Sequence, residues 1–365
     1  MTKTWSNALL DSQRLSSDHT ADALIQLIMT EGLHAQLGIL MQAEKNTDVL
    51  DASLHPDILR FAAELHVLPP WADQKKIEIA EAFFKEYQIY VYSALLFASL
   101  PYCYAAADGA RVLAMSNRMK DTTGKRLSET GQYIMDVSEP GAFASKGKAF
   151  KSIIKIRLIH AAVRYRLNKS GVWKSEWGLP INMEDMAGTN LAFSLVTLRA
   201  METMGAPLDK SIRDAFIHKW NIISYLQGLD ESLLPADYAE ALLLEKRIQV
   251  RLFRPSEEGK NLTRSLTRFI EEIERPLAPE YGAHMIRHLL GNQVGDLLGL
   301  PEISLLNWPA LMSSLNAVVA GMGWSPREKD MYIPLHLALI KRGKVQNERI
   351  EYPLQDLLKP GSKHD

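Results

Sequence analysis

The chain has 365 residues, 47% of them hydrophobic and 23% charged, which is the composition of a globular protein and excludes a mainly disordered chain. Its 42 Lys and Arg residues balance 43 Asp and Glu residues, so the basic excess typical of nucleic-acid-binding proteins is absent and we expect no nucleic-acid partner. The single cysteine, Cys103, excludes an internal disulfide framework and a thiolate-ligated metal cluster. Together with a polar start that contains no secretory signal, it predicts a cytoplasmic protein.

Apolar residues recur at helical spacing along nearly the whole chain. In chain order, helices are predicted over residues 23–41, 56–65, 73–100, 108–119, 125–137, 145–168, 183–204, 211–226, 236–251, 258–274, 280–290 and 308–322. Thr20 or Asp22 is expected to cap the first of these helices. Pro101 is expected to end the third near Leu100, because proline disfavours the helical conformation of the residue before it.

The pattern predicts an all-α protein, because sustained strand alternation is nearly absent. Residues 331–340 could form a strand, but Pro334 argues against a central one. No fixed repeat and no flexible linker divides the chain, so we expect a single large domain over residues 1–365, with its core over about 21–340 and a polar tail over 344–365.

The uncharged stretch 87–107 is rich in tyrosine, which favours a buried helix over a transmembrane span. We therefore expect no transmembrane span. A homodimer is compatible with a helical protein of this size, although no heptad pattern predicts one.

Common enzyme motifs are missing from the sequence. It contains no P-loop, no Gly-x-Gly-x-x-Gly stretch after a strand, no Gly-x-Ser-x-Gly elbow and no His-Glu-x-x-His. A helical di-iron site needs two Glu-x-x-His units, and only Glu31 and His34 have this spacing. His284 and His288 lie one helical turn apart and could clamp a metal, but an ordinary helix surface is the favoured interpretation.

A basic helix carries the first candidate site. Arg157, His160 and Arg164 lie at i, i+3 and i+7 and therefore share one face of the helix predicted over residues 145–168. Two guanidinium groups are costly to bury unless an anion neutralises them. A haem meets both needs, since its iron takes an axial imidazole and its propionates take arginines. Spacing alone favours the alternative, a helix whose basic side chains reach solvent and whose histidine lies in the core.

A second cluster precedes this helix in the chain. Arg126, Glu129 and Thr130 lie at i, i+3 and i+4, again on one helical face. Taken alone, the three residues are typical of a charged surface with an Arg–Glu pair that contributes well under about 1 kcal/mol to stability.

Four motifs give the chain a resemblance to a known family. They are residues 68–73 (LPPWAD), residues 126–130 (RLSET), the spacing Arg157-x-x-His160-x-x-x-Arg164 and residues 179–189 (LPINMEDMAGT). With these motifs the chain resembles the helical haem-b oxygenases of the latex-clearing (rubber oxygenase) and farnesyl-chain-cleaving group, over roughly residues 21–301. The last two motifs together are the specific part of the resemblance.

The resemblance implies a cofactor, a reaction and site residues. It implies haem b with His160 as the axial iron ligand, and Arg157 and Arg164 supporting the haem and its propionates. Arg126, Glu129 and Thr130 would line the distal pocket. O2 and an apolar, unsaturated small molecule would be the reactants, and oxidative C=C cleavage the reaction. We expect the substrate pocket between the helices over residues 87–104 and 183–204.

The sequence departs from the rubber-cleaving pattern at two site positions and lacks an export signal. Glu129 stands where that group has a distal lysine, and Met183 stands where a glutamine is usual. A carboxylate would act as a base or proton relay rather than as an iron ligand. Three alternatives therefore stay open: a haem protein with other oxidative chemistry such as hydroxylation or peroxygenation, a non-catalytic protein that binds haem or an apolar ligand, and a helical partner-docking module without a cofactor.

Overall fold

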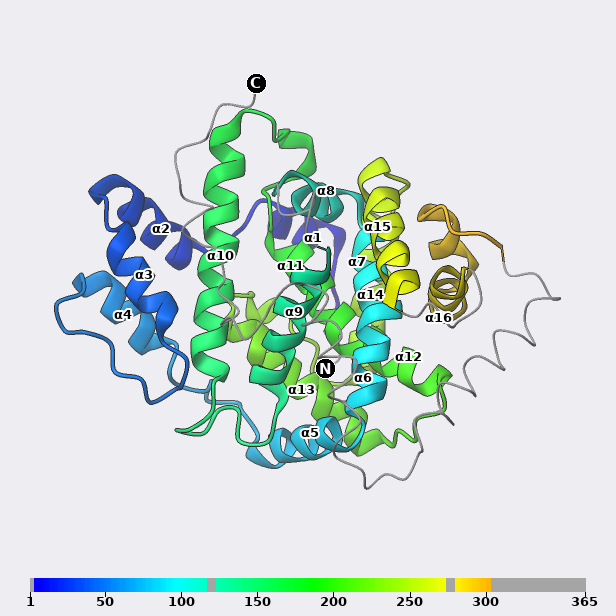
Figure 1. Ribbon diagram of the computed structural model, residues 1–365, viewed down its shortest axis with the longest axis horizontal. Coiled ribbons are helices and arrows are strands. Elements are labelled where there is room, and N and C mark those ends of the chain that lie inside the picture. Colours follow the sequence, from blue (N-terminus) through cyan, green and yellow to red (C-terminus); the bar gives the residue numbers. More distant parts are fainter. Residues whose placement is uncertain (1–2, 117–122, 274–279, 303–365) are drawn as a thin grey trace.

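The structure is a computed structural model that describes residues 3–116, 123–273 and 280–302. Within these ranges the chain forms helices and no strand; the β-type pairing found there is an isolated bridge between Ala106 and Phe253 (Figure 1). The predicted all-α class is confirmed.

The helices follow one another with short connections. They are α1 (Asn7–Arg14), α2 (His19–Glu31), α3 (His34–Gln42), α4 (Pro56–Glu64), α5 (Gln74–Glu86), α6 (Gln88–Ala94), the π-helix η1 (Leu95–Ser99), α7 (Leu100–Ala105), α8 (Ala107–Met115), α9 (Thr123–Ser138), α10 (Ala149–Ser170), the 3-10 helix η2 (Ser175–Trp177), α11 (Met183–Leu191), the π-helix η3 (Ala192–Val196), α12 (Thr197–Thr203), α13 (Lys210–Leu226), the 3-10 helix η4 (Glu231–Leu233), α14 (Tyr238–Leu252), α15 (Glu257–Ile273) and α16 (Tyr281–Leu297).

The first long predicted helix differs from the structure at both its start and its middle. Asp18, not Thr20 or Asp22, caps α2 by accepting a hydrogen bond from the Ala21 amide, so the helix begins four residues earlier than predicted. Gly32, with a φ of +71°, ends α2 and separates it from α3. Helical periodicity continues across this break, which is why the sequence pattern alone did not reveal it.

The prediction that the third helix ends at Pro101 is wrong. The chain passes through the π-helix η1, in which the Leu100 amide donates to the Leu95 carbonyl, and continues as α7 to Ala105. The wider π-turn places Pro101 in the first turn of a new α-helical segment, where its missing N–H is tolerated. A second π-helix, η3, lies against η1, and the hydroxyls of Ser99 and Thr197 share a buried 2.9 Å hydrogen bond beside them.

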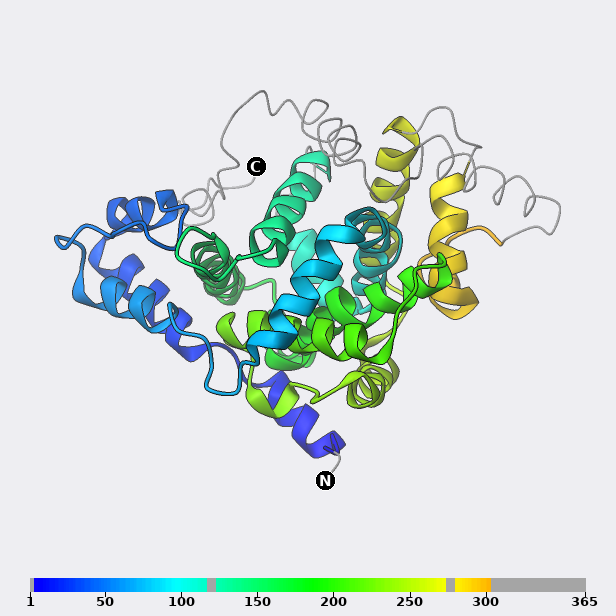
Figure 2. The ribbon, with the colours of Figure 1, turned by 90° about the horizontal axis from the view of Figure 1, so that it is seen from below.

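Helix α10 lies between two hydrophobic clusters. On one side it packs on α2, where Ile154 and Leu158 join the cluster of α2 and α4; on the other side Ile153 joins the main cluster, built largely from α5, α6 and α11–α14. Figures 1 and 2 show α2–α4 at one edge of the molecule and α15 and α16 at the opposite edge, with α10 between α2–α4 and the rest. The histidine-bearing helix is therefore central.

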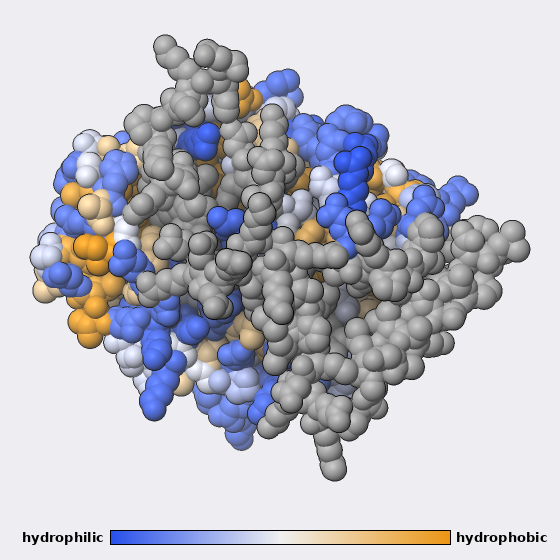
Figure 3. All heavy atoms as spheres, in the orientation of Figure 1, coloured by the Kyte–Doolittle hydropathy of each residue, from blue (hydrophilic) through white to orange (hydrophobic). Residues whose placement is uncertain are grey.

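The surface is mixed in character. Figure 3 shows apolar side chains gathered at the edge where α2–α4 lie, and Ile39 and Val49 from this part of the chain are exposed. Across the described ranges no helix combines the length and apolarity needed to cross a bilayer.

Three predictions concern residues that the structure does not describe. The predicted helix over residues 308–322, the segment 331–340 and the tail over 344–365 lie outside the described residues. The single domain, the homodimer and the cytoplasmic location stay predictions.

Candidate active site

A cavity of about 330 Å³ lies among α7–α11, η3, α13 and α14. This volume is within the range of small-molecule binding sites. Four of the six predicted site residues line it: Arg126, Glu129, Thr130 and His160. The structure thus brings His160 of α10 to the same cavity as the three residues of α9, whereas Arg157 and Arg164 do not line it.

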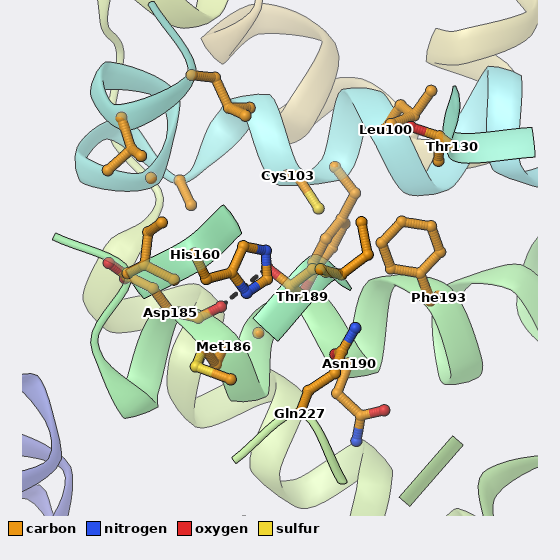
Figure 4. A pocket seen from close by; sticks show the side chains of 18 of the residues that line it. Leu100, Cys103, Thr130, His160, Asp185, Met186, Thr189, Asn190, Phe193 and Gln227 are labelled. Atoms are coloured by element: carbon orange, nitrogen blue, oxygen red, sulfur yellow. Dashed lines mark hydrogen bonds between the residues drawn. The ribbon is translucent and has the colours of Figure 1, made fainter. Parts of the chain in front are cut away.

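Part of the wall comes from the two segments that the sequence analysis expected, residues 87–104 and 183–204, and the rest comes from α8, α9, α10, α13 and α14. Residues 100–104 contribute Leu100, Tyr102, Cys103 and Tyr104, and α11 with η3 contributes Met186, Gly188, Thr189, Asn190 and Phe193. Figure 4 shows Leu100, Cys103 and Thr130 above His160 in that view, with Met186, Asn190 and Gln227 below it. Trp220, Leu252 and Phe253 extend the apolar part of the wall.

His160 presents a neutral imidazole to this cavity. Its ring is partly exposed to the cavity, while Nδ1 is enclosed and has no hydrogen-bond partner among the described residues. Burial and, to a smaller extent, the nearby Arg164 guanidinium lower the pKa of His160 to about 4, although Asp18 opposes both. At neutral pH the ring therefore carries no charge and keeps a nitrogen lone pair for a metal.

Arg126, Glu129 and Thr130 project from one face of α9 into the same cavity. Glu129 is buried, so this cluster is not the exposed charged surface that its spacing alone would suggest. Burial raises the pKa of the Tyr104 hydroxyl, and the Arg126 guanidinium partly offsets that rise, which places a positive charge near Tyr104 on the cavity wall.

Arg157 does not line the cavity. Its Nε and Nη2 donate to the Asp18 carboxylate at 2.5 and 2.8 Å, and Nη1 donates to the Leu226 carbonyl at 3.2 Å. All three guanidinium nitrogens are therefore engaged within the protein. The expected contact of Arg157 with a propionate stays a prediction, and these bonds do not support it.

Arg164 is also absent from the cavity wall, but its guanidinium is not fully engaged. Nε donates to Asp22 Oδ1 at 2.7 Å and Nη1 contacts the Ile181 carbonyl at 3.4 Å. Nη2 is buried without a hydrogen-bond partner in the described part of the chain. Arg164 thus keeps a donor for a further acceptor, which leaves its predicted propionate contact open.

Comparisons with known proteins relate this chain to a family of oxygenases. The family model described as "ER-bound oxygenase mpaB/B'/Rubber oxygenase, catalytic domain" matches residues 89–322, more than half of the chain. The chain belongs to this oxygenase family. It is 25% identical over 306 residues to the rubber oxygenase of Streptomyces sp. (strain K30), covering 81% of this chain and 75% of that protein. The structure titled latex clearing protein LCP in the closed state has a similar fold, with a TM-score of 0.74, 23% identity and 91% of each chain covered.

The family match confirms the resemblance inferred from the motifs, and it covers every predicted site residue, from Arg126 to Arg164. It also makes the chain an oxygenase-family enzyme. Residue roles are a separate matter, because a shared family and fold do not by themselves assign chemistry to individual side chains.

Sequence reasoning missed one acidic residue on the wall of this oxygenase-family cavity. Asp185, from the 179–189 motif, lines the cavity, and its burial raises the pKa of its carboxyl to about 6 despite the neighbouring Arg14 guanidinium. The adjacent Glu184 is fully buried and pairs with Arg251 at 2.6 Å. The sequence alone does not connect these two acids with a cavity, because their partners, Arg14 and Arg251, lie far away in the chain.

The remaining metal candidates do not assemble into a site. Among the described residues no group of three or more His, Cys, Asp or Glu side chains could hold a metal ion. Glu31 lies 3.7 Å from His55 rather than in a paired carboxylate site. The favoured interpretation of His284 as an ordinary surface residue is wrong, because this side chain of α16 is buried.

Proposed function

We propose that this protein is a haem-b-dependent oxygenase that cleaves a C=C bond of an apolar, unsaturated small molecule. The observation that carries the proposal is the meeting of a neutral imidazole, His160, with the polar side chains of α9 on the wall of one mainly apolar cavity. Family membership supports oxygenase chemistry, and the residues of this cavity are suited to it.

The residues present fit a haem. His160 is held neutral by burial, so it can ligate iron through Nε2 without first losing a proton. The spare Nη2 of Arg164 is suited to a carboxylate, which would satisfy a buried donor that otherwise has no partner among the described residues. When bound, the haem would supply the binding and activation of O2.

The side chains of α9 would serve the reacting groups. Glu129 is a candidate acid or base, because its carboxyl group lies on the cavity wall and is shielded from bulk water. Thr130 is suited to orienting oxygen by donating a hydrogen bond, and Arg126 to stabilising negative charge that develops beside it. Burial of Glu129 strengthens its interactions, since charges act more strongly where water is excluded.

The apolar walls favour a hydrocarbon substrate. Leu100, Phe193, Trp220, Leu252 and Phe253 offer contacts to alkyl and alkene carbons but few directional hydrogen bonds. The relative named a rubber oxygenase suggests a polyisoprene-like compound. We propose an isoprenoid alkene, whose carbon chain would contact these apolar walls.

An absorption spectrum of the purified, haem-supplemented protein tests the cofactor. We expect a Soret band that changes on reduction and on addition of CO, and that is lost or displaced in His160→Ala. The matched control is His55→Ala, a histidine paired with Glu31 outside the cavity, which should leave the band unchanged. A wild-type protein without a Soret band, or a His160→Ala protein with an unaltered one, would contradict the haem proposal.

Product analysis under ¹⁸O2 with a short isoprenoid alkene tests the reaction. Dioxygenase cleavage would put label in both carbonyl fragments. Unlabelled or hydroxylated products, or turnover with peroxide in the absence of O2, would assign the protein to the other oxidative chemistry. Iron held by two protein ligands and silent toward O2, CO and peroxide would instead indicate a non-catalytic binding protein.

A further inference from the structure

Two ion pairs flank His160, one helical turn on either side. Arg157 binds Asp18 and Arg164 binds Asp22, so these two arginines of α10 both reach across to the start of one other helix, α2. The two aspartates are four residues apart, and the two arginines are seven apart. A four-residue and a seven-residue spacing both keep side chains on one face of a helix, so the two pairs join a single face of α10 to a single face of α2.

The ion pair between Asp18 and Arg157 is tightly packed. Asp18 is buried; its Oδ1 accepts hydrogen bonds from both the Ala21 amide and Arg157 Nη2. Gly228 lies directly against the pair: a Cβ at this position would lie 2.5 Å from Asp18 Oδ2 and 3.0 Å from Arg157 Nε. The backbone therefore closes over this ion pair, and any larger residue would displace it.

The second pair is anchored in a similar way. Ser17 donates a hydrogen bond to Asp22 Oδ2 at 2.8 Å, which leaves Oδ1 for Arg164. The Arg164 side chain is almost completely enclosed, so its orientation is restricted by packing as well as by charge. The helix between the two pairs carries His160.

Both pairs also act on the imidazole through their charges. Arg164 disfavours a proton on His160, and Asp18 favours one. Arg157 is paired with Asp18 and Arg164 with Asp22, so each of these guanidinium groups has a carboxylate partner. Loss of either aspartate would leave an unpaired guanidinium beside the ring.

We propose that Asp18 and Asp22 are positioning residues for His160: through Arg157 and Arg164 they hold α10, the helix that carries His160, against α2. The purpose of this arrangement rests on the proposed function, in which His160 ligates haem iron. On this view Arg157 serves the site through the protein and not by direct contact with the cofactor.

The test uses Asp18→Asn in the full-length protein. Asparagine is as good a helix cap as aspartate, so the change keeps the Ala21 hydrogen bond and the side-chain shape while removing the charge that holds Arg157. Asp22→Asn is the second variant. The control is Glu81→Gln, which breaks the buried 3.0 Å pair with Lys219 between α5 and α13, outside the cavity wall.

Backbone hydrogen exchange in the haem-free protein gives the first readout. We expect the amides of residues 157–164 to exchange at least tenfold faster in Asp18→Asn than in wild type, and no such local change in Glu81→Gln. Equal acceleration in both variants would mean that the aspartate only contributes to global stability, and would overturn the proposal.

The haem-loaded protein gives the second readout. An unpaired cation beside the iron favours the ferrous state, so the midpoint potential should rise by about 59 mV for each tenfold change in the ratio of ferrous to ferric affinity. We expect a rise of this size in Asp18→Asn or in Asp22→Asn, together with at least a tenfold weaker haem affinity. Unchanged potential and affinity in both variants would overturn the proposal, whereas absence of haem binding by wild type would contradict the proposed function instead, leaving hydrogen exchange to decide the positioning role.

Discussion

Arg14 donates a hydrogen bond to Asp185 Oδ1 at 3.2 Å, and in this way links the end of α1 to the cavity wall. The same guanidinium donates to Asp108 at 2.9 Å and lies 3.5 Å from Glu184. Three carboxylates thus lie around the Arg14 guanidinium, and burial raises the pKa of one of them, Asp185, to about 6.

This raised pKa predicts a pH-dependent stability. Between about pH 4 and 6 the folded protein holds the Asp185 proton and the unfolded chain does not, so the contribution of Asp185 to the free energy of unfolding falls as the pH rises through this range. The full change is about 3 kcal/mol. Urea unfolding of wild type and Asp185→Asn at pH 4, 5, 6 and 7 measures it. We expect the stability of the variant relative to wild type to increase from pH 4 to pH 7, and a constant difference would contradict the assigned pKa.

The helices and the two residue clusters could be predicted from the sequence because both depend on local spacing. Arg157, His160 and Arg164 fall on one face of α10 whatever the rest of the chain does, and Arg126, Glu129 and Thr130 do the same on α9. That His160 and the three residues of α9 line one cavity could be expected only from the family resemblance, since spacing on one helix says nothing about the distance to another.

The partners of the arginines could not be predicted. Asp18 and Arg157 are 139 residues apart, and Asp22 and Arg164 are 142 apart, so no sequence pattern connects them. Asp22 was instead interpreted as a cap, a role that Asp18 fills. The prediction of a helix end at Pro101 was wrong for a related reason. The π-turn that accommodates Pro101 lies in η1, which packs on η3, and this tertiary contact cannot be read from local spacing.

Glu129 is expected to affect turnover and not cofactor binding. Glu129→Gln keeps the shape of the buried side chain but removes its ability to exchange a proton, so kcat should fall by about 10²-fold to 10⁴-fold, the usual contribution of a general acid or base. Haem affinity from a Soret titration should stay within a few-fold of wild type. A variant with wild-type kcat would remove Glu129 from the mechanism.

Glu129→Lys restores the residue that the rubber-cleaving pattern has at this position. A neutral amine can ligate iron, whereas the carboxylate is suited to proton transfer, so we expect the spectrum of the ferric protein to change to that of a six-coordinate iron. Absorption spectra before and after addition of imidazole check this. A spectrum identical to that of wild type would mean that position 129 does not reach the sixth coordination site.

His160 should stay uncharged well below neutral pH. Its pKa of about 4 lies under the ordinary value of about 6.5, so between these values the unfolded chain binds a proton that the folded protein does not. The contribution of His160 to stability is therefore complete above pH 6.5 and is lost as the pH falls toward 4, a change of about 3 kcal/mol. An NMR titration of the histidine ring protons in haem-free protein, with His160→Ala to assign the signal, should give a midpoint near pH 4, and a midpoint above 6 would contradict it.

Two glycines with the same φ allow the cost of crowding the Asp18–Arg157 pair to be measured. Gly228 and Gly205 both have a φ of +91°, so an alanine is in the left-handed region at either position. A Cβ at Gly228 would meet Asp18 Oδ2 at 2.5 Å, whereas nothing lies within 4 Å of a Cβ at Gly205. Gly228→Ala should therefore lower the free energy of unfolding by about 1–3 kcal/mol more than Gly205→Ala, a typical cost of forcing extra volume into a packed interior. Chemical denaturation of the two variants measures the difference, and equal losses would mean that the ion pair can move aside at no cost.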